Sequence, residues 1–181
     1  MTTTTHLPAT HPTATHLTET QPLADLVDGV RTAVDAHASW PATAQLVAAQ
    51  LRRHLPTPDV LTAEQRLGSP DGYRSHVLHV APDGAFSIVA VVWRPGQITR
   101  IHDHVTWCVF GVIQGIEREE LFDADLNLVG VNDNHTGDVS GFAPPGDIHR
   151  VHNTTGTTAI SIHIYGTDVT RVGSSVRRYY N

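Results

Sequence analysis

WRPGQITRIHDHVTWCVFGVIQGIEREEL, residues 93–121, is the most informative part of the chain, and His102-Asp103-His104 lies at its centre. The segments on either side are rich in β-branched and aromatic side chains, which predicts strands. Because residues i and i+2 of a strand point to the same face, His102 and His104 are expected to face one side and Asp103 the other. Two such imidazoles supply half of a site for iron, zinc, copper or nickel. The alternative is a pair of solvent-facing or hydrogen-bonded histidines.

Two later segments favour the metal site. Residues 137–153, GDVSGFAPPGDIHRVHN, contain a Pro-Pro-Gly-Asp turn, and His149 begins a short run of alternating character just after it. Residues 159–165 alternate between isoleucine and polar side chains, which places Ser161, His163 and Tyr165 on one face of a strand. In a small barrel, a polar inner face of this kind usually lines a ligand cavity.

Composition limits the classes of function that fit. The chain has 181 residues, is 40% hydrophobic and carries a net charge of −6, with no basic cluster longer than a pair of arginines. Nucleic acid is therefore not an expected partner. No apolar run approaches the roughly 20 residues that span a bilayer, so no membrane partner is expected, and we expect no secretory signal. The single cysteine fits a reducing, cytoplasmic compartment.

We expect three regions along the chain. Residues 1–20 are rich in Thr, Pro and His and predict a disordered tail. Residues 21–70 show helical periodicity, with helices up to Val34, from Pro41 to His54, and a short one at residues 62–66. Residues 71–181 read as a β-barrel whose strands are separated by turn signals. The strands are expected at residues 75–80, 86–93, 98–102, 106–113, 117–122, 126–131, 138–142, 149–152 and 159–165.

The spacing of the histidines and glycines resembles the two motifs of the cupin superfamily. The residues that carry this resemblance are Gly96, His102, His104, Gly115, Pro144, Gly146, His149 and Asn153. Within the cupins the chain is most similar to the thiol dioxygenases, the group of cysteine dioxygenase and 3-mercaptopropionate dioxygenase. The resemblance implies a mainly β fold, a jelly-roll barrel with N-terminal helices, that holds one non-haem Fe(II).

The resemblance also implies a set of site residues. Most cupins have a glutamate where this chain has Cys108 or Val109. The implied ligands are therefore the neutral histidines His102, His104 and His149. The group's Ser-His-Tyr triad corresponds to Ser161, His163 and Tyr165. The implied reaction joins a small thiol and O2 to form a sulfinic acid.

Two features of the implied site stay open at this level. In some cysteine dioxygenases a cysteine near the position of Cys108 forms a thioether with the tyrosine of the triad; an unlinked buried thiol is the alternative here. The substrate carboxylate is expected to bind Arg74, Arg177 or Arg178, and the substrate itself is L-cysteine, 3-mercaptopropionate or a related thiol.

Other readings are a cupin dioxygenase or isomerase that acts on another substrate with zinc or manganese, and a non-catalytic cupin that binds a metal or small molecule. The expected assembly is a monomer or a small homo-oligomer.

Overall fold

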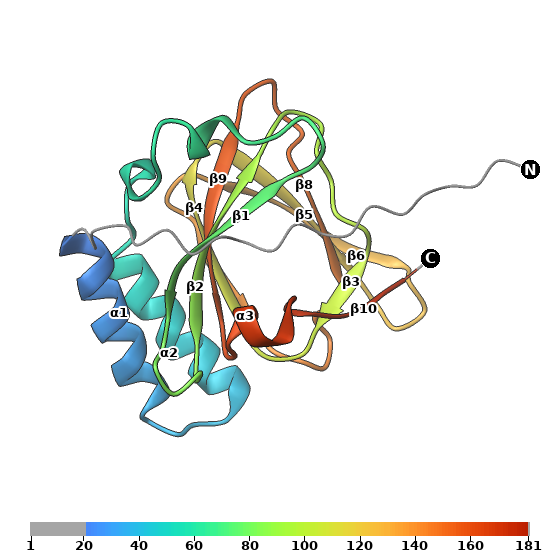
Figure 1. The fold of residues 1–181 in the computed structure, drawn as a ribbon. Coiled ribbons are helices and arrows are strands. Elements are labelled where there is room, and N and C mark those ends of the chain that lie inside the picture. The colour runs from blue at the N-terminus through green and yellow to red at the C-terminus, as the bar shows by residue number, and fades with distance from the viewer. Residues whose placement is uncertain (1–20, 181) are drawn as a thin grey trace, which may run out of the picture.

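The computed structural model describes residues 21–180, and its strands form two antiparallel sheets (Figure 1). The helices are α1 (Gln21–Val34), α2 (Trp40–Arg53) and α3 (Val169–Val172), with 3-10 turns η1 (Pro58–Val60) and η2 (Gln65–Leu67). The strands are β1 (Arg74–Val80), β2 (Ser87–Trp93), β3 (His102–His104), β4 (Cys108–Gln114), β5 (Ile116–Phe122), β6 (Leu128–His135), β7 (Val139–Phe142), β8 (His149–His152), β9 (Ala159–Tyr165) and β10 (Val176–Tyr179).

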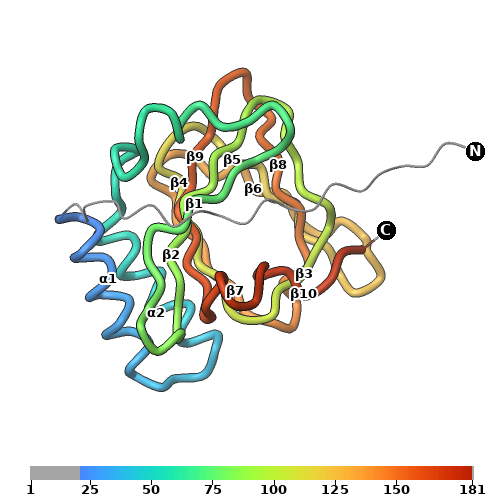
Figure 2. The backbone as a smooth tube through the Cα atoms, in the orientation of Figure 1, coloured from blue at the N-terminus to red at the C-terminus, as the bar shows by residue number. Residues whose placement is uncertain are grey.

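The two sheets have five strands each. One has the order β1-β2-β9-β4-β7 and the other the order β10-β3-β8-β5-β6. Figure 2 shows the strands arranged around a ring, with α1 and α2 outside one wall of it. Sequence neighbours such as β2 and β3 lie in different sheets, as a jelly roll requires. The predicted fold class, a mainly β jelly roll with N-terminal helices, is confirmed.

The helices cover the outer face of the first sheet, which explains why the outward-facing side chains of β2 are apolar and buried. β2 is buried along its whole length. Its residues Ile88, Ala90 and Val92 belong to a core that also contains the buried faces of α1 and α2. Val89, Val91 and Trp93 alternate with them and belong to a second cluster inside the barrel.

The alternation predicted for β9 is present. The three isoleucines at positions 160, 162 and 164 are fully buried in the core beneath the helices. The polar side chains between them therefore face the barrel interior. β9 pairs with both β2 and β4, so this polar row lies along the middle of the first sheet.

Gly115 makes the turn from β4 to β5, where the chain passes from one sheet to the other. Its φ is +78°, in the left-handed region that favours glycine, and a Cβ there would lie 3.0 Å from Ala159 Cα. Backbone conformation and close approach to β9 both require glycine at this corner.

Several predicted boundaries were wrong. The strand expected at residues 98–102 is irregular, apart from an isolated bridge at Ile98, and β3 covers only His102–His104. The helix expected at residues 62–66 is the 3-10 turn η2, and neither α3 nor β10 was predicted. β10 has no apolar alternation; it pairs with β3 along the backbone, and its two arginines contact Asp103. The tail predicted at residues 1–20 lies outside the described residues.

Among residues 21–180, no helix has the length and apolar character needed to cross a membrane.

Candidate metal centre

Three histidines converge inside the second sheet. His102 and His104 lie on β3, and His149 lies on β8 as the direct antiparallel partner of His102. All three are buried, and one ring nitrogen from each lies within 4.8 Å of the other two. The Nε2 atoms of His102 and His149 are 3.2 Å apart. The predicted ligand histidines are thus brought together by strand pairing between segments almost 50 residues apart.

Each histidine uses its Nδ1 atom to bind a neighbouring oxygen. The contacts are His102 Nδ1 with the Arg100 carbonyl at 2.9 Å, His104 Nδ1 with Asp147 Oδ2 at 3.2 Å, and His149 Nδ1 with Glu119 Oε1 at 2.8 Å. A carbonyl or a carboxylate accepts hydrogen bonds, so each Nδ1 is the protonated donor. In a neutral ring the Nε2 atom is then left with a lone pair that is available for an ion.

The electrostatics of the cluster also favour neutral imidazoles. Burial, followed by the proximity of His149 and His104, lowers the pKa of His102 to about 3. Burial is also the largest cause that lowers the pKa of His104, and it outweighs the opposing effect of Asp147. Two imidazole nitrogens that each bind one ion at about 2.1 Å lie at most about 4.2 Å apart, so the 3.2 Å between His102 and His149 suits a shared ion. The donor set fits a non-haem metal centre.

Asp103 points to the opposite face of β3, as the sequence predicted. Its buried carboxylate accepts hydrogen bonds from Arg178 Nε at 2.9 Å and from the Tyr180 hydroxyl at 2.8 Å, and it also pairs with Arg177. Burial raises the pKa of Asp103, but these hydrogen bonds outweigh burial and hold it at about 2. The carboxylate between the two ligand histidines thus ties β10 to β3 and does not take part in the cluster.

The polar row of β9 lies beside the histidines. Ser161 Oγ is 2.9 Å from His163 Nε2, and the Tyr165 hydroxyl is 3.2 Å from His163 Nδ1. Burial is the main cause that lowers the pKa of His163 to about 3, so this ring is neutral. The Tyr165 ring stacks against His104, with centroids 6.3 Å apart. The three residues therefore form a hydrogen-bonded line that ends next to the metal ligands.

Cys108 is the direct cross-strand partner of Tyr165. The two residues are paired between β4 and β9, so their side chains leave the sheet on the same face. Cys108 is free and buried, and burial raises the pKa of its thiol. The register therefore places the thiol next to the tyrosine of the row.

The three predicted substrate arginines all have partners. Arg74, at the start of β1, donates to Ser69 Oγ at 3.0 Å and lies 3.8 Å from Asp71. Arg177 and Arg178 contact Asp103, whose side chain leaves β3 on the face opposite the ligand histidines. Their role as anchors for a substrate carboxylate stays a prediction.

Sequence reasoning missed the acidic residues around the cluster. Asp147 and Glu119 bind two of the ligand histidines, and Glu117 is buried beside Glu119 on the same inward face of β5. The sequence signal for Glu117 and Glu119 is their Glu-x-Glu spacing within a predicted strand, which puts both carboxyl groups on one face. Asp147 is the last residue of the Pro-Pro-Gly-Asp turn, and the turn pattern does not show that its carboxylate binds a histidine.

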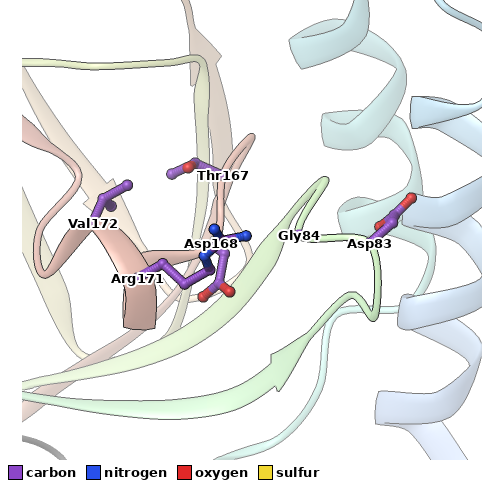
Figure 3. A pocket seen from close by; sticks show the side chains of 6 residues that line it. All are labelled: Asp83, Gly84, Thr167, Asp168, Arg171 and Val172. Atoms are coloured by element: carbon purple, nitrogen blue, oxygen red, sulfur yellow. The ribbon is translucent and has the colours of Figure 1, made fainter.

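A surface recess elsewhere on the fold does not compete with this site. Figure 3 shows it between the β1–β2 turn and α3, and its lining residues are Asp83, Gly84, Thr167, Asp168, Arg171 and Val172. Both of its carboxylates are engaged: Asp83 pairs with Arg31, and Asp168 accepts from the backbone of Thr170 at the start of α3. The histidine cluster is therefore the better candidate.

Together, the jelly roll and its inward-facing histidine cluster define a metal-binding cupin. The family model for cysteine dioxygenase type I matches residues 62–175, a range that contains all three histidines and the polar row. The chain belongs to that family, within the thiol dioxygenase group of the cupins.

Three solved structures with similar folds share 16–19% sequence identity with this chain. An oxalate oxidase in complex with glycolate is 17% identical with a TM-score of 0.46, and 55% of this chain covers 53% of that one. A Klebsiella pneumoniae protein with a double-stranded β-helix domain is 19% identical, with coverage of 58% and 85% and a TM-score of 0.47. A Thermus thermophilus protein is 16% identical, with coverage of 59% and 96% and a TM-score of 0.47. The chain thus spans about half of the oxalate oxidase.

Proposed function

We propose that this protein is an iron(II)-dependent thiol dioxygenase that oxidises a small thiol, L-cysteine or 3-mercaptopropionate, to its sulfinic acid. In this reaction both atoms of O2 are transferred to sulfur, so no external reductant is needed. The observation that supports it best is the set of three imidazole ring nitrogens within 4.8 Å of one another, in a cluster that includes no carboxylate.

His102, His104 and His149 would hold the iron, each through Nε2. When bound, iron(II) would supply a single centre at which the thiol sulfur and dioxygen are held next to each other. A neutral ligand set leaves such a centre with a net positive charge, which favours an anionic thiolate over a neutral thiol. No separate base would then be needed to deprotonate the substrate.

The role proposed for the polar row is to orient the Tyr165 hydroxyl toward the reacting groups. His163 holds that hydroxyl at 3.2 Å, and Ser161 holds the other side of the imidazole at 2.9 Å. Because His163 is buried and neutral, it acts as a fixed hydrogen-bond partner and carries no charge of its own. The phenol can then donate to an oxygen atom or to a polar group of the substrate.

Aromatic rings around the ligands would limit access of water. Phe142 packs against His104 and His149, with ring centroids 5.1 and 4.9 Å apart. Phe110 stacks on His163 at 5.7 Å. In a dry site the charge interactions with a bound thiolate are stronger than in water.

We further propose that Cys108 and Tyr165 become joined by a thioether. An Sγ–C bond to the phenol ring forms, the S–H and ring C–H bonds break, and O2 accepts the two electrons and two protons. The support is the direct cross-strand pairing of the two residues. The intact mass of protein after aerobic turnover should be lower by two hydrogen atoms, and Cys108→Ser should lack that loss. An unchanged mass would mean that the thiol stays free.

The proposed anchor for a substrate carboxylate is one of Arg74, Arg177 and Arg178. Arg74 follows Tyr73, whose ring packs on the Trp93 ring with centroids 4.5 Å apart. This contact brings the start of β1 to the inner cluster of the barrel. Replacing the true anchor by alanine should raise KM for a carboxylate-bearing thiol far more than it lowers kcat.

The deciding experiment measures oxygen uptake by iron(II)-loaded protein with L-cysteine and 3-mercaptopropionate in parallel, with the sulfinate identified by mass. Uptake matched by sulfinate from one thiol, and lost in His149→Ala, is the expected result. Zinc- or manganese-loaded protein should be inactive. Stoichiometric iron without uptake on either thiol would reject both substrates and favour another cupin activity or a binding function.

A further inference from the structure

Glu117 is a buried carboxyl group that the proposed reaction does not use. It is 1% exposed and lies on the inward face of β5, two residues before Glu119. Glu119 binds His149. Neither carboxyl oxygen of Glu117, by contrast, has a hydrogen-bond partner among residues 21–180. A buried acidic group is costly unless it is paired, so its presence inside the barrel calls for a role.

The neighbours of this carboxyl lie at the deep end of the polar row. Burial raises the pKa of Glu117 to about 8; the Ser161 hydroxyl and the Trp93 indole are close enough to lower it, and Glu119 raises it further. Glu117 in turn contributes to the raised pKa of Tyr165. At neutral pH the group is therefore mostly a neutral carboxylic acid, with one hydrogen to donate.

The hydrogen bonds around Ser161 can be counted. Its oxygen has two lone pairs and one hydrogen, and Trp93 Nε1 already donates to it over 3.4 Å. If Glu117 donates to the second lone pair, the hydroxyl hydrogen must go to His163 Nε2, 2.9 Å away. The hydrogen of that neutral ring is then on Nδ1, where it is donated to the Tyr165 oxygen over 3.2 Å. His163 then does not accept the phenolic hydrogen of Tyr165, and Ser175 and the metal site are the partners that remain for it.

We infer that Glu117 is a positioning residue that sets the tautomer of His163 through Ser161 and so determines whether Tyr165 offers its hydroxyl hydrogen to the metal site. The polar row therefore has four members, Glu117, Ser161, His163 and Tyr165, and it starts on β5 in the second sheet. Hydrogen bonds join Ser161, His163 and Tyr165, Glu117 lies close enough to Ser161 for the hydroxyl to lower its pKa, and Tyr165 stacks on the ligand His104.

When Glu117 ionises, the donor and the acceptor exchange roles in each hydrogen bond between Glu117, Ser161, His163 and Tyr165. The Ser161 hydroxyl turns to the carboxylate, His163 carries its hydrogen on Nε2 and donates it to Ser161, and Nδ1 accepts the Tyr165 hydroxyl. Each residue passes one hydrogen to the next residue toward Tyr165, so the row as a whole loses one proton. Because Glu117 is sealed from solvent and Tyr165 is half-buried, the proton leaves at the Tyr165 end.

The titratable groups that face this row come from five strands and from Tyr73, just before β1. β5 supplies Glu119, β9 supplies His163 and Tyr165, β4 supplies Cys108, β8 supplies His149, and β3 supplies His102 and His104. β2 contributes the neutral indole of Trp93, and Asn134 of β6 is paired with Glu117. Glu119 stays bound to His149, so Glu117 is the member of this set whose ionisation acts directly on Ser161.

Glu117→Gln separates this inference from a packing role. The glutamine amide has the same size and donates to Ser161 at every pH, so the variant should hold His163 in the Nδ1–H form. Ser161→Ala leaves the Glu117 carboxyl group in place but removes the hydroxyl between it and His163. The tautomer of His163 should then no longer depend on the ionisation of Glu117. Glu120→Gln is the matched control, because Glu120 lies on the same strand and pairs outward with Arg150.

The first measurement is 15N NMR of the histidine rings in metal-free protein between about pH 6 and pH 10. Wild type and Glu120→Gln should show His163 exchanging its hydrogen from Nδ1 to Nε2 with a midpoint near pH 8, as expected from the titration of Glu117. Glu117→Gln and Ser161→Ala should show no such exchange. A wild-type His163 that keeps one tautomer, or a Glu117→Gln variant with an unchanged midpoint, would overturn the inference.

The second measurement rests on the proposed function. Above the same midpoint, kcat of iron-loaded wild type should fall toward that of Tyr165→Phe with KM unchanged, while Glu117→Gln should keep its kcat. If the tautomer follows Glu117 but no thiol is oxidised, the inference holds and the thiol dioxygenase proposal fails. If sulfinate forms and neither tautomer nor kcat responds to Glu117, the inference fails and the proposed function stands.

Discussion

Two carboxylates behind the ligand histidines determine which ring nitrogen is free to bind metal. Glu119 Oε1 lies 2.8 Å from His149 Nδ1, and Asp147 Oδ2 lies 3.2 Å from His104 Nδ1 and 2.8 Å from the backbone nitrogen of the same residue. Both contacts fix the tautomer and the ring orientation before an ion arrives. Glu119 and Asp147 thus orient two of the ligand histidines without being metal ligands themselves.

Glu119→Gln should weaken metal binding about 10- to 100-fold, because a neutral amide is a poorer acceptor for His149 and holds its ring less firmly. The measurement is competition for the metal with a chelator of known affinity. Glu120→Gln changes the same chemical group at the adjacent, outward position that pairs with Arg150, and should bind metal as wild type does. Equal affinity in both variants would mean that Glu119 does not orient its histidine.

β10 shows how a single buried side chain can hold an element in place. Within the part of the chain that the structure describes, this strand pairs only with β3, and its arginines reach Asp103, which lies between two ligand histidines. The pKa of Asp103 is held at about 2, below its ordinary 3.8, so the interaction stabilises the fold above that ordinary value. The stabilisation is lost as pH falls from about 4 toward 2.

Asp103→Asn should loosen β10 at neutral pH by roughly 2 to 3 kcal/mol, because charged hydrogen bonds to the carboxylate are lost. Amide hydrogen exchange should accelerate at residues 176–179 and stay slow in β2 and β9. In wild type the protection of β10 should decline below about pH 4, and the variant should lack that decline.

Asp133→Asn is the matched control for this exchange experiment, because Asp133 forms an exposed pair with Arg118 and surface pairs contribute little. Uniform acceleration over the whole barrel in Asp103→Asn would mean that Asp103 supports the fold as a whole and not one strand.

The sequence predicted elements well where the pattern was apolar and poorly where it was polar. The helices ending at Val34 and Arg53 and most strands of the barrel lie within a few residues of their expected positions. The register of β10 depends on ion pairs with a residue more than 70 positions away, and η2 depends on a Thr62–Gln65 turn. Periodicity carries no information about either contact.

The two faces of the first sheet carry different kinds of side chain. α1 and α2 bury the outer face of the first sheet in the main core, so the inner face is free to carry polar groups. The ligands come from the second sheet and Ser161, His163 and Tyr165 from the first, so an intact barrel is required to bring them together.

Metal binding should therefore stabilise the entire fold. An ion present at about 100 times its dissociation constant adds about 2.7 kcal/mol, which corresponds to roughly 5 to 10 °C in Tm for a domain of this size. Differential scanning calorimetry with iron(II) under anaerobic conditions tests this, and a chelator should reverse the shift. His102→Ala should show none; an equal shift in that variant would place the ion elsewhere.

The sequence by itself determined the strand alternation, the common face of His102 and His104, and the polar row of β9. These follow from a backbone in which side chains alternate every residue, a property that needs no distant partner. Only the tertiary structure decided which oxygens hold the ligand histidines, that Asp103 binds β10, and that Glu117 lies buried beside Ser161. These depend on the register between strands far apart in the sequence, and burial changes the chemistry of each carboxyl group after the sheets have closed.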